Sequence, residues 1–301
     1  ETHVKTIIKA CKRALILFGL GLLLTLIPAV FFEPVAALRE MRIPGVLQRI
    51  AVVFLISAIL FLKVSERNLR LLFMILLAVY WVLMTFVPVP GSGPANLEKE
   101  TNLGAWLDRT VFTEAHLWRS SKTWDPEGLL GTIPAVATGL FGVLVGVYLR
   151  RKDIADANKV SWLFCTGCAA VTLGLLWNLE FPINKALWTS SFVLFTGGLA
   201  TTVLAMSYWV IDVNKYNRFT KPFVVYGVNA ITVYFLSGVT PQLLSLIRLK
   251  NGETNLYSWL YSGYAANFSP LNASLLWAIS TVLFWLIILW IMYNKKIIIK
   301  V

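Results

Sequence analysis

The stretch Ala273-Ser-Leu-Leu-Trp-Ala-Ile-Ser-Thr-Val-Leu-Phe-Trp-Leu-Ile-Ile-Leu-Trp-Ile-Met-Tyr293 contains no charged residue. A helix of this length rises about 30 Å, which matches the hydrocarbon core of a bilayer. Lipid offers the backbone no hydrogen bonds, so a helix is the structure expected for such a run. Seven further apolar runs of comparable length are residues 14–32, 44–62, 71–89, 131–149, 160–179, 186–211 and 222–239. We therefore expect one all-α domain over residues 1–301, a polytopic membrane protein with about eight transmembrane helices.

The charge distribution predicts how this protein is oriented. Hydrophobic residues make up 57% of the chain, charged residues 14%, and the formal net charge is +12. Seventeen Lys and Arg residues fall in one set of alternate loops and nine in the other. Because cytoplasmic loops carry the excess of positive charge, we expect the first set and both chain termini in the cytoplasm. Basic residues spread over separate loops favour a lipid bilayer, and not nucleic acid, as the partner.

One polar motif enters the second apolar run. It reads Arg42-Ile-Pro-Gly-Val-Leu-Gln-Arg49, and Pro44 in it suits the first turn of a helix. Arg42 and Arg49 are seven residues apart and therefore lie on one helical face. Arg49 falls inside the hydrocarbon, where a charge is expensive and marks either a functional site or a structural ion pair. We assign Arg42, Gln48 and Arg49 to substrate binding.

Residues 90–130 form the longest hydrophilic segment, which we expect on the outer face. In it, Asp125 suits a helix N-cap and Glu127 suits the positive end of the helix dipole. The same helix N-terminus also suits an anionic or acyl oxygen, so the two interpretations are compatible. His116 is one of only two histidines, and the ring nitrogens of a histidine suit a general acid or base. We assign His116, Glu127 and Asp125 as catalytic candidates, although a structural role remains open for each.

A second cluster opens the sixth apolar run. It places Asn184, Lys185, Trp188 and Ser190 within two helical turns of one another, at the end of the run that we expect on the outer face. Trp188 also suits an interfacial anchor, and Lys185 a side chain that reaches the headgroups. We assign these four residues to substrate binding. The two histidines lie far apart, with no zinc-like spacing, and we expect no metal site.

Taken together, these motifs resemble the heparan-alpha-glucosaminide N-acetyltransferase family. The motifs are Arg42–Arg49, His116-Leu, Asp125-Pro-Glu-Gly-Leu-Leu-Gly-Thr132, Asn184-Lys185 with Leu187-Trp188, Asn229 in Val228-Asn-Ala-Ile, and the basic pair Lys295-Lys296. Their order and rough spacing match over nearly the whole chain. The short leader and compact loops favour a bacterial relative in the inner membrane.

The resemblance implies a membrane acetyltransferase. It implies acetyl-CoA as co-substrate on the cytoplasmic side, a glucosamine-type amino sugar or glycan as acceptor on the other side, and a possible homodimer. It also adds Asn229 to the substrate-binding residues. In the family the histidine regarded as catalytic lies in the first outer loop, which here falls before Glu1, so we expect an N-terminal part of the protein to precede this chain.

A different class of function fits the same residues. Arg49 and Lys185 suit the path of a transporter or flippase for an anionic glycan or lipid precursor. Release of the CoA thiol distinguishes the two classes, because a transporter leaves it at background.

Overall fold

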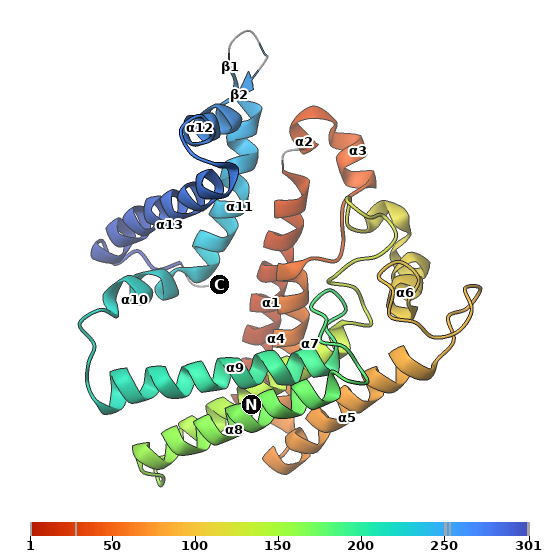
Figure 1. Cartoon of the computed structure of the whole chain (residues 1–301), viewed down its shortest axis with the longest axis vertical. Coiled ribbons are helices and arrows are strands. Elements are labelled where there is room, and N and C mark those ends of the chain that lie inside the picture. The colour runs from red at the N-terminus through yellow and green to blue at the C-terminus, as the bar shows by residue number, and fades with distance from the viewer. Residues whose placement is uncertain (1, 28, 250–251, 253, 300–301) are drawn as a thin grey trace. The chain divides into compact units, whose positions relative to one another are not determined.

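The computed structural model describes residues 2–27, 29–249, 252 and 254–299, and its regular structure is almost entirely helical, as the sequence predicts (Figure 1). The chain divides into two compact units. The first unit comprises Glu1–Leu22 and Arg39–Tyr216, and the second comprises Leu23–Leu38 and Asn217–Val301.

The first unit contains the long helices that surround the candidate site. Helix α1 (Thr2–Leu26) opens it and ends in the second unit. The other elements are α4 (Val46–Lys63), α5 (Glu66–Phe86), α6 (Leu103–Phe112), the 3₁₀ turn η1 (Glu114–His116), α7 (Thr132–Leu149), α8 (Asp156–Trp177), α9 (Ser190–Tyr208) and the π-helical turn η2 (Trp209–Val213).

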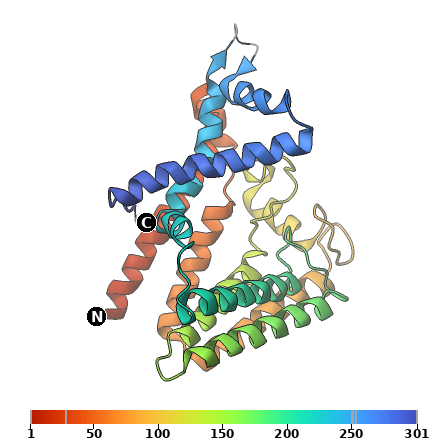
Figure 2. The ribbon, with the colours of Figure 1, turned by 60° about the vertical axis from the view of Figure 1, so that its left-hand side comes forward.

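The core of the first unit lies where α5, α7 and α9 meet. Leu77, Leu140 and Val193 pack there, and each is at most 1% exposed. Helices α8 and α9 run side by side in Figures 1 and 2. A Cβ added at Gly198 of α9 would lie 2.6 Å from the carbonyl oxygen of Gly167 in α8. Glycine at this crossing therefore lets the two backbones approach as closely as they do.

The second unit contains shorter and bent elements. They are α2 (Ala29–Phe32), α3 (Pro34–Arg39), α10 (Lys221–Val228), α11 (Ala230–Leu246), the strands β1 (Arg248–Leu249) and β2 (Thr254–Asn255), α12 (Leu256–Ala265) and α13 (Pro270–Asn294). Strands β1 and β2 pair antiparallel, with Arg248 opposite Asn255. Helices α10 and α11 meet at an angle of 76°, and Asn229 lies between them.

Six of the described helices are long and apolar enough to cross a membrane, or seven if the bent pair α10 and α11 counts as one span. The six are α4, α5, α7, α8, α9 with η2, and α13. Seven of the eight predicted runs thus have a counterpart among the described residues; residues 14–32, of which Pro28 lies outside the described residues, have none. Helix α1 starts at Thr2, so Lys9, Lys12 and Arg13 lie within it. Its uncharged part, 14–26, rises only about 20 Å, which is short of a bilayer core.

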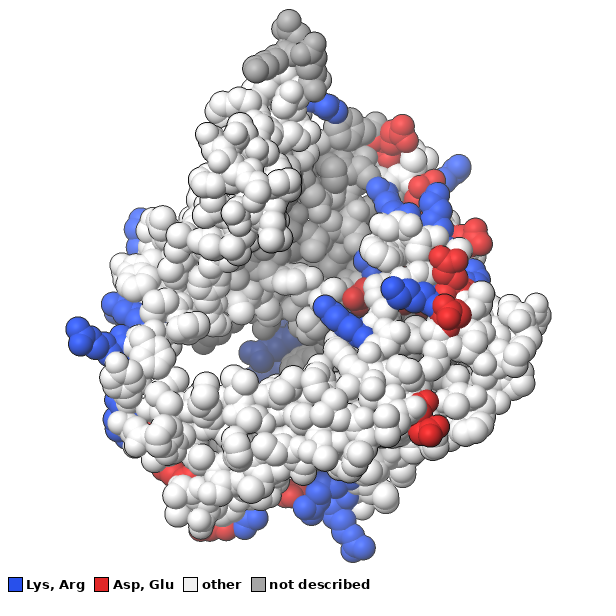
Figure 3. All heavy atoms as spheres, viewed as in Figure 1, with Lys and Arg blue, Asp and Glu red and all other residues white. Residues whose placement is uncertain are grey.

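Residues 90–130 are more ordered than the expected loop. A tight turn joins Val89 to Gly93, with Gly91 and Gly93 at φ values of 73° and 102° that favour glycine. Helix α6 follows, capped by the Asn102 side chain, which accepts from Ala105 N at 3.0 Å. Figure 3 shows acidic and basic side chains gathered over α6 and the loops beside it, whereas the face of α9 is largely uncharged. Residues 90–130 therefore bring charged side chains of both signs together on the face shown in Figure 3.

Candidate functional site

A buried ion cluster joins the motif at residues 42–49 to the C-terminal end of the 90–130 segment. Arg42 donates from Nε to Asp125 Oδ2 at 2.8 Å and from Nη2 to Asp125 Oδ1 at 2.6 Å. Nη2 also donates to Glu127 Oε2 at 2.5 Å. The Asp125 side chain is fully buried, and those of Arg42 and Glu127 are 18% and 16% exposed. Burial disfavours the charged form of Arg42 and so lowers its pKa. The hydrogen bonds and negative charges of Asp125 and Glu127 have the larger combined effect, and the pKa of Arg42 is therefore raised above its usual value.

His116 fixes the backbone on both sides of Arg42. Its carbonyl oxygen accepts from Ile43 N at 3.0 Å, and its Nδ1 lies 2.8 Å from the carbonyl oxygen of Met41. Because a carbonyl only accepts, Nδ1 carries the hydrogen in this pair. His116 therefore positions Arg42, and its acid–base role stays a prediction.

Asp125 does not cap a transmembrane helix, which corrects the N-cap expectation. Helix α7 starts at Thr132, and Gly131 is its N-cap residue. The Asp125 carboxylate instead closes a local turn, with Oδ1 accepting from Glu127 N at 2.9 Å, while both oxygens also accept from Arg42. Pro44 likewise precedes its helix, because α4 begins at Val46 after the N-cap residue Gly45.

Arg49 is the second arginine of the site and is only partly satisfied. It is 7% exposed, and its Nη2 donates to the carbonyl oxygen of Gly128 at 3.2 Å. Its guanidinium carbon lies 5.2 Å from the centre of the Trp188 ring, a cation–π contact. Among the described residues, Nε and Nη1 of Arg49 have no hydrogen-bond partner. These two nitrogens of the buried Arg49 are therefore free to donate hydrogen bonds to a polar ligand.

Gln48 faces a different neighbour from Arg49, although the two are adjacent. A Cβ added at Gly21 of α1 would lie 2.2 Å from Gln48 Oε1. Gln48 thus packs against α1, and within the described residues no hydrogen bond joins it to Arg42 or Glu127. Its place in the binding set stays a prediction.

Asp108 does not stand out in the sequence, but the structure places it in the site. This residue of α6 is 2% exposed, and its Oδ1 accepts from Leu129 N at 2.8 Å. Burial raises the pKa of Asp108 to about 7, although the Leu129 bond favours the charged form. A Cβ added at Gly128 would lie 1.8 Å from Asp108 Oδ2, so glycine is required for this approach. In the sequence Asp108 is one of several acidic residues in a polar segment, which gave no signal of its burial.

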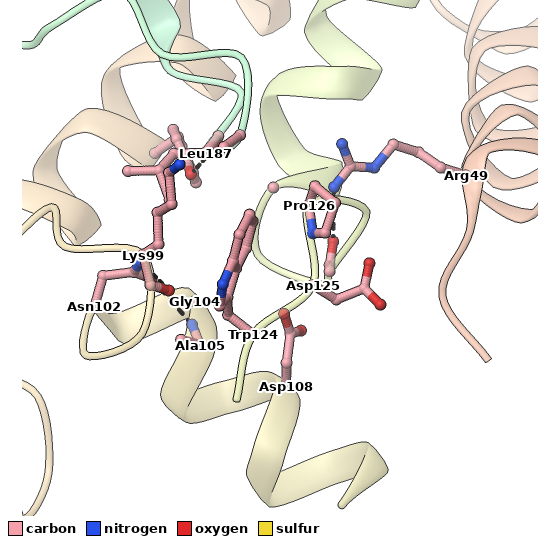
Figure 4. Close-up of a pocket in the computed structure, with 14 residues that line it drawn as sticks. Arg49, Lys99, Asn102, Gly104, Ala105, Asp108, Trp124, Asp125, Pro126 and Leu187 are labelled. Carbon is pink, nitrogen blue, oxygen red and sulfur yellow. Dashed lines mark hydrogen bonds between the residues drawn. The ribbon is translucent and has the colours of Figure 1, made fainter. Parts of the chain in front are cut away.

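Asp108 and Arg49 line the same small cavity, shown in Figure 4. Its volume is about 20 Å³, and Trp124, Asp125 and Leu187 also line it. The cavity therefore brings together α4, α6 and the loops at 124–128 and 187.

In the cluster at residues 184–190, the side chains of Asn184 and Ser190 form hydrogen bonds with backbone groups and so stabilise the loop and the start of α9. Asn184 Oδ1 accepts from the backbone N–H groups of Ala186 and Leu187, and Ser190 Oγ donates to the Leu77 carbonyl at 2.8 Å. Lys185 is exposed. Trp188 is the residue of the cluster that contacts Arg49, and its Nε1 donates to Thr138 Oγ1 at 3.1 Å. Helix α9 begins at Ser190, later than the predicted start at residue 186.

Asn229 lies in the second unit. Its Nδ2 donates to the Ile297 carbonyl at 3.1 Å, and its Oδ1 accepts from Ile299 N at 2.9 Å. It is 1% exposed and ties the C-terminal segment to the junction of α10 and α11. The assignment to substrate binding stays a prediction.

No group of three His, Cys, Asp or Glu side chains suited to a metal ion occurs among the described residues.

Comparison with known proteins gives two relevant matches. The chain is 28% identical to human heparan-alpha-glucosaminide N-acetyltransferase, over 87% of this chain and 44% of the human protein. It is 26% identical to the mouse protein of the same name, over 87% of this chain and 45% of the mouse protein. No family model matches. The chain thus spans less than half the length of these relatives, and the comparison confirms its resemblance to the heparan-alpha-glucosaminide N-acetyltransferase family.

Proposed function

We propose that this protein is an acetyl-CoA-dependent transmembrane N-acetyltransferase. It moves the acetyl group of cytosolic acetyl-CoA to the amino group of a glucosamine-type sugar on the opposite side of the membrane. The observation that carries the proposal is the similarity to two N-acetyltransferases along 87% of the chain. Six apolar helices of spanning length support a reaction that takes place within a bilayer.

The basic loops suit the nucleotide end of acetyl-CoA. Acetyl-CoA is polyanionic, and the alternate loops that we expect in the cytoplasm carry seventeen of the 27 Lys and Arg residues. Its phosphates then remain at a wet, basic face, and only the thioester has to reach the acceptor. No multiply charged group enters the hydrocarbon, where its desolvation would be prohibitive.

The buried cluster suits the acceptor end of the reaction. Arg42 is neutralised by Asp125 and Glu127, so it shapes the site and is not itself the ligand's partner. Arg49 and Trp188 are in contact, and we assign them to contacts with the acyl group or the acceptor. His116 donates from Nδ1 to Met41, so its neutral form leaves Nε2 unprotonated, as a general base requires.

Calorimetry with acetyl-CoA on the detergent-purified complete protein tests the proposal. We expect binding at low salt that weakens as salt rises, because exposed charges are screened over about 10 Å at 0.1 M. Desulfo-CoA serves as a ligand control, because it keeps the phosphates and lacks the thioester. If a folded sample binds no acetyl-CoA at low salt but carries an anionic glycan across the membrane of proteoliposomes, the transporter interpretation replaces this one.

A further inference from the structure

A cavity of about 460 Å³ lies between helices α11, α12 and α13 of the second unit, which pack on one another (Figure 1). Pockets that bind small molecules measure about 300–1,000 Å³ and are mostly apolar. None of the described residues that line this cavity is charged. They include five large apolar side chains: Leu244, Leu260, Trp277, Phe284 and Trp285. The size and lining of the cavity therefore suit an apolar ligand.

Four hydroxyl groups on the cavity wall are already engaged within the protein. Three of them donate to carbonyl oxygens of their own helices, and the fourth accepts from the Tyr264 hydroxyl of α12. These hydrogen bonds measure 2.7–3.1 Å, and the residues are Ser237, Thr240, Thr281 and Ser280. A sugar ring would bury several hydroxyl groups here with few partners left for them, which is costly. The wall therefore favours a hydrocarbon chain over a sugar.

Two polar side chains, Tyr257 and Arg248, lie next to the strand pair of β1 and β2. Tyr257 lines the cavity and follows shortly after Asn255, which pairs with Arg248 across the strands. Arg248 is exposed, and among the described residues neither its guanidinium nor the Tyr257 hydroxyl has a hydrogen-bond or ion-pair partner. Because α10 and α11 count together as one span, Arg248 lies just beyond its end, at the level expected for lipid headgroups. These two groups therefore suit the polar part of a lipid.

The cavity adjoins the surface of α13 that we expect lipid to cover. Helix α13 is one of the candidate spans, and its Leu275 and Leu283 are 58% and 52% exposed. Phe284 lines the cavity and is itself 52% exposed. An acyl chain can therefore enter from the bilayer along α13 without crossing a charged surface.

We propose that this cavity holds an acyl chain of an anionic glycerophospholipid, with the ester group near the Tyr257 hydroxyl and the phosphate near Arg248. A phenol donates to an ester carbonyl, and an arginine attracts the charge of an anionic headgroup. A zwitterionic lipid is disfavoured, because no acidic side chain among the described lining residues attracts its ammonium group. The lipid site shares no residue with the candidate functional site and does not rest on the proposed function.

A cryo-EM map of the complete protein tests the occupant. The protein is placed in nanodiscs of equal parts phosphatidylglycerol and phosphatidylcholine. We expect chain-like density between α11, α12 and α13 that ends in a headgroup beside Arg248. An empty cavity, or one filled by polypeptide or by a headgroup-free molecule, overturns the inference.

Native mass spectrometry of the detergent-purified complete protein, titrated with either lipid, tests the residues. Thr281→Trp places a ring in the cavity and should weaken the tightest phosphatidylglycerol binding at least about tenfold. Thr172→Trp makes the same change at an exposed threonine of α8 that also donates to its own helix, and should leave this binding unchanged.

Arg248→Gln tests the headgroup separately. This variant should lower the preference for phosphatidylglycerol over phosphatidylcholine about fivefold, because it removes one basic residue near the anionic headgroup. Arg248 is exposed, so its replacement keeps the test available if Thr281→Trp fails to fold. An unchanged preference in Arg248→Gln, or unchanged binding in folded Thr281→Trp, overturns the inference.

Discussion

Replacing Arg42 by glutamine removes the cation of the buried cluster and leaves its carboxylates in place. Asp125 loses two N–H donors at 2.6 and 2.8 Å while its side chain stays fully buried, and Glu127 loses one donor. Removing one partner of a buried ion pair costs about 3–5 kcal/mol, because the remaining charge is left without compensation. We expect Arg42→Gln to reduce the free energy of unfolding by this amount.

The same substitution at Arg70 is a matched control. Arg70 pairs with Glu66 at 3.7 Å on α5, and the two side chains are 63% and 54% exposed. Such exposed pairs one helical turn apart contribute about 0.3–0.5 kcal/mol. The assay is reversible unfolding in mixed detergent micelles, followed by tryptophan fluorescence, with both variants measured at the same pH and salt.

A second variant isolates the cause of the loss. Adding Asp125→Asn to Arg42→Gln removes the uncompensated charge, so the double variant is expected to be more stable than Arg42→Gln alone. If Arg42→Gln destabilises the protein no more than Arg70→Gln does, the buried cluster does not hold the two motifs together.

The pKa of Asp108 is about 7 in the fold against an ordinary 3.8, so the folded state holds this proton more tightly than the unfolded state and loses stability as pH rises from about 4 to 7. Asp108→Asn should remove up to roughly 4 kcal/mol of this pH-dependent loss of stability. The measurement is the free energy of unfolding as a function of pH, and a variant with the same pH profile as the unaltered protein would contradict the prediction. Gly128→Ala forces a Cβ to 1.8 Å from the Asp108 carboxylate and should cost about 1–3 kcal/mol, whereas Gly142→Ala, with open space around it, should not lower the melting temperature. Ser92→Cys should react with a membrane-impermeant maleimide from outside intact cells, and labelling only after cytoplasmic access would reverse the predicted orientation.

The spanning helices were predictable where charge and apolar length agree. The predicted run at residues 44–62 corresponds to α4, Val46–Lys63, since both ends of that run carry turn or charged residues. The run at residues 14–32 has no counterpart among the described spanning helices, because α1 begins at Thr2 in the basic leader and therefore includes Lys9, Lys12 and Arg13. The run at 222–239 was predicted as one helix, but it bends by 76° at Asn229, whose side chain binds the C-terminal segment. A hydropathy pattern carries no information about such a distant partner.

The site was predictable by residue type but not by pairing. Arg42, Asp125 and Glu127 each stood out in their motifs, yet the sequence does not reveal that residues 83 and 85 positions apart pair. Asp125 was expected to cap a helix, but its carboxylate is committed to Arg42 and α7 starts later at Thr132. Asp108 was missed because a carboxylate in a polar segment is usually solvated, and its burial depends on Gly128 lying directly against it.

The most direct test of the proposed function is transfer of a labelled acetyl group across a sealed membrane. The complete protein is reconstituted in proteoliposomes that enclose glucosamine, and acetyl-CoA with a labelled acetyl group is added outside. The account predicts that labelled N-acetylglucosamine accumulates in the lumen with one free CoA thiol released outside per product. Thiol release at background from folded, reconstituted protein, with no labelled product in the lumen, would contradict it.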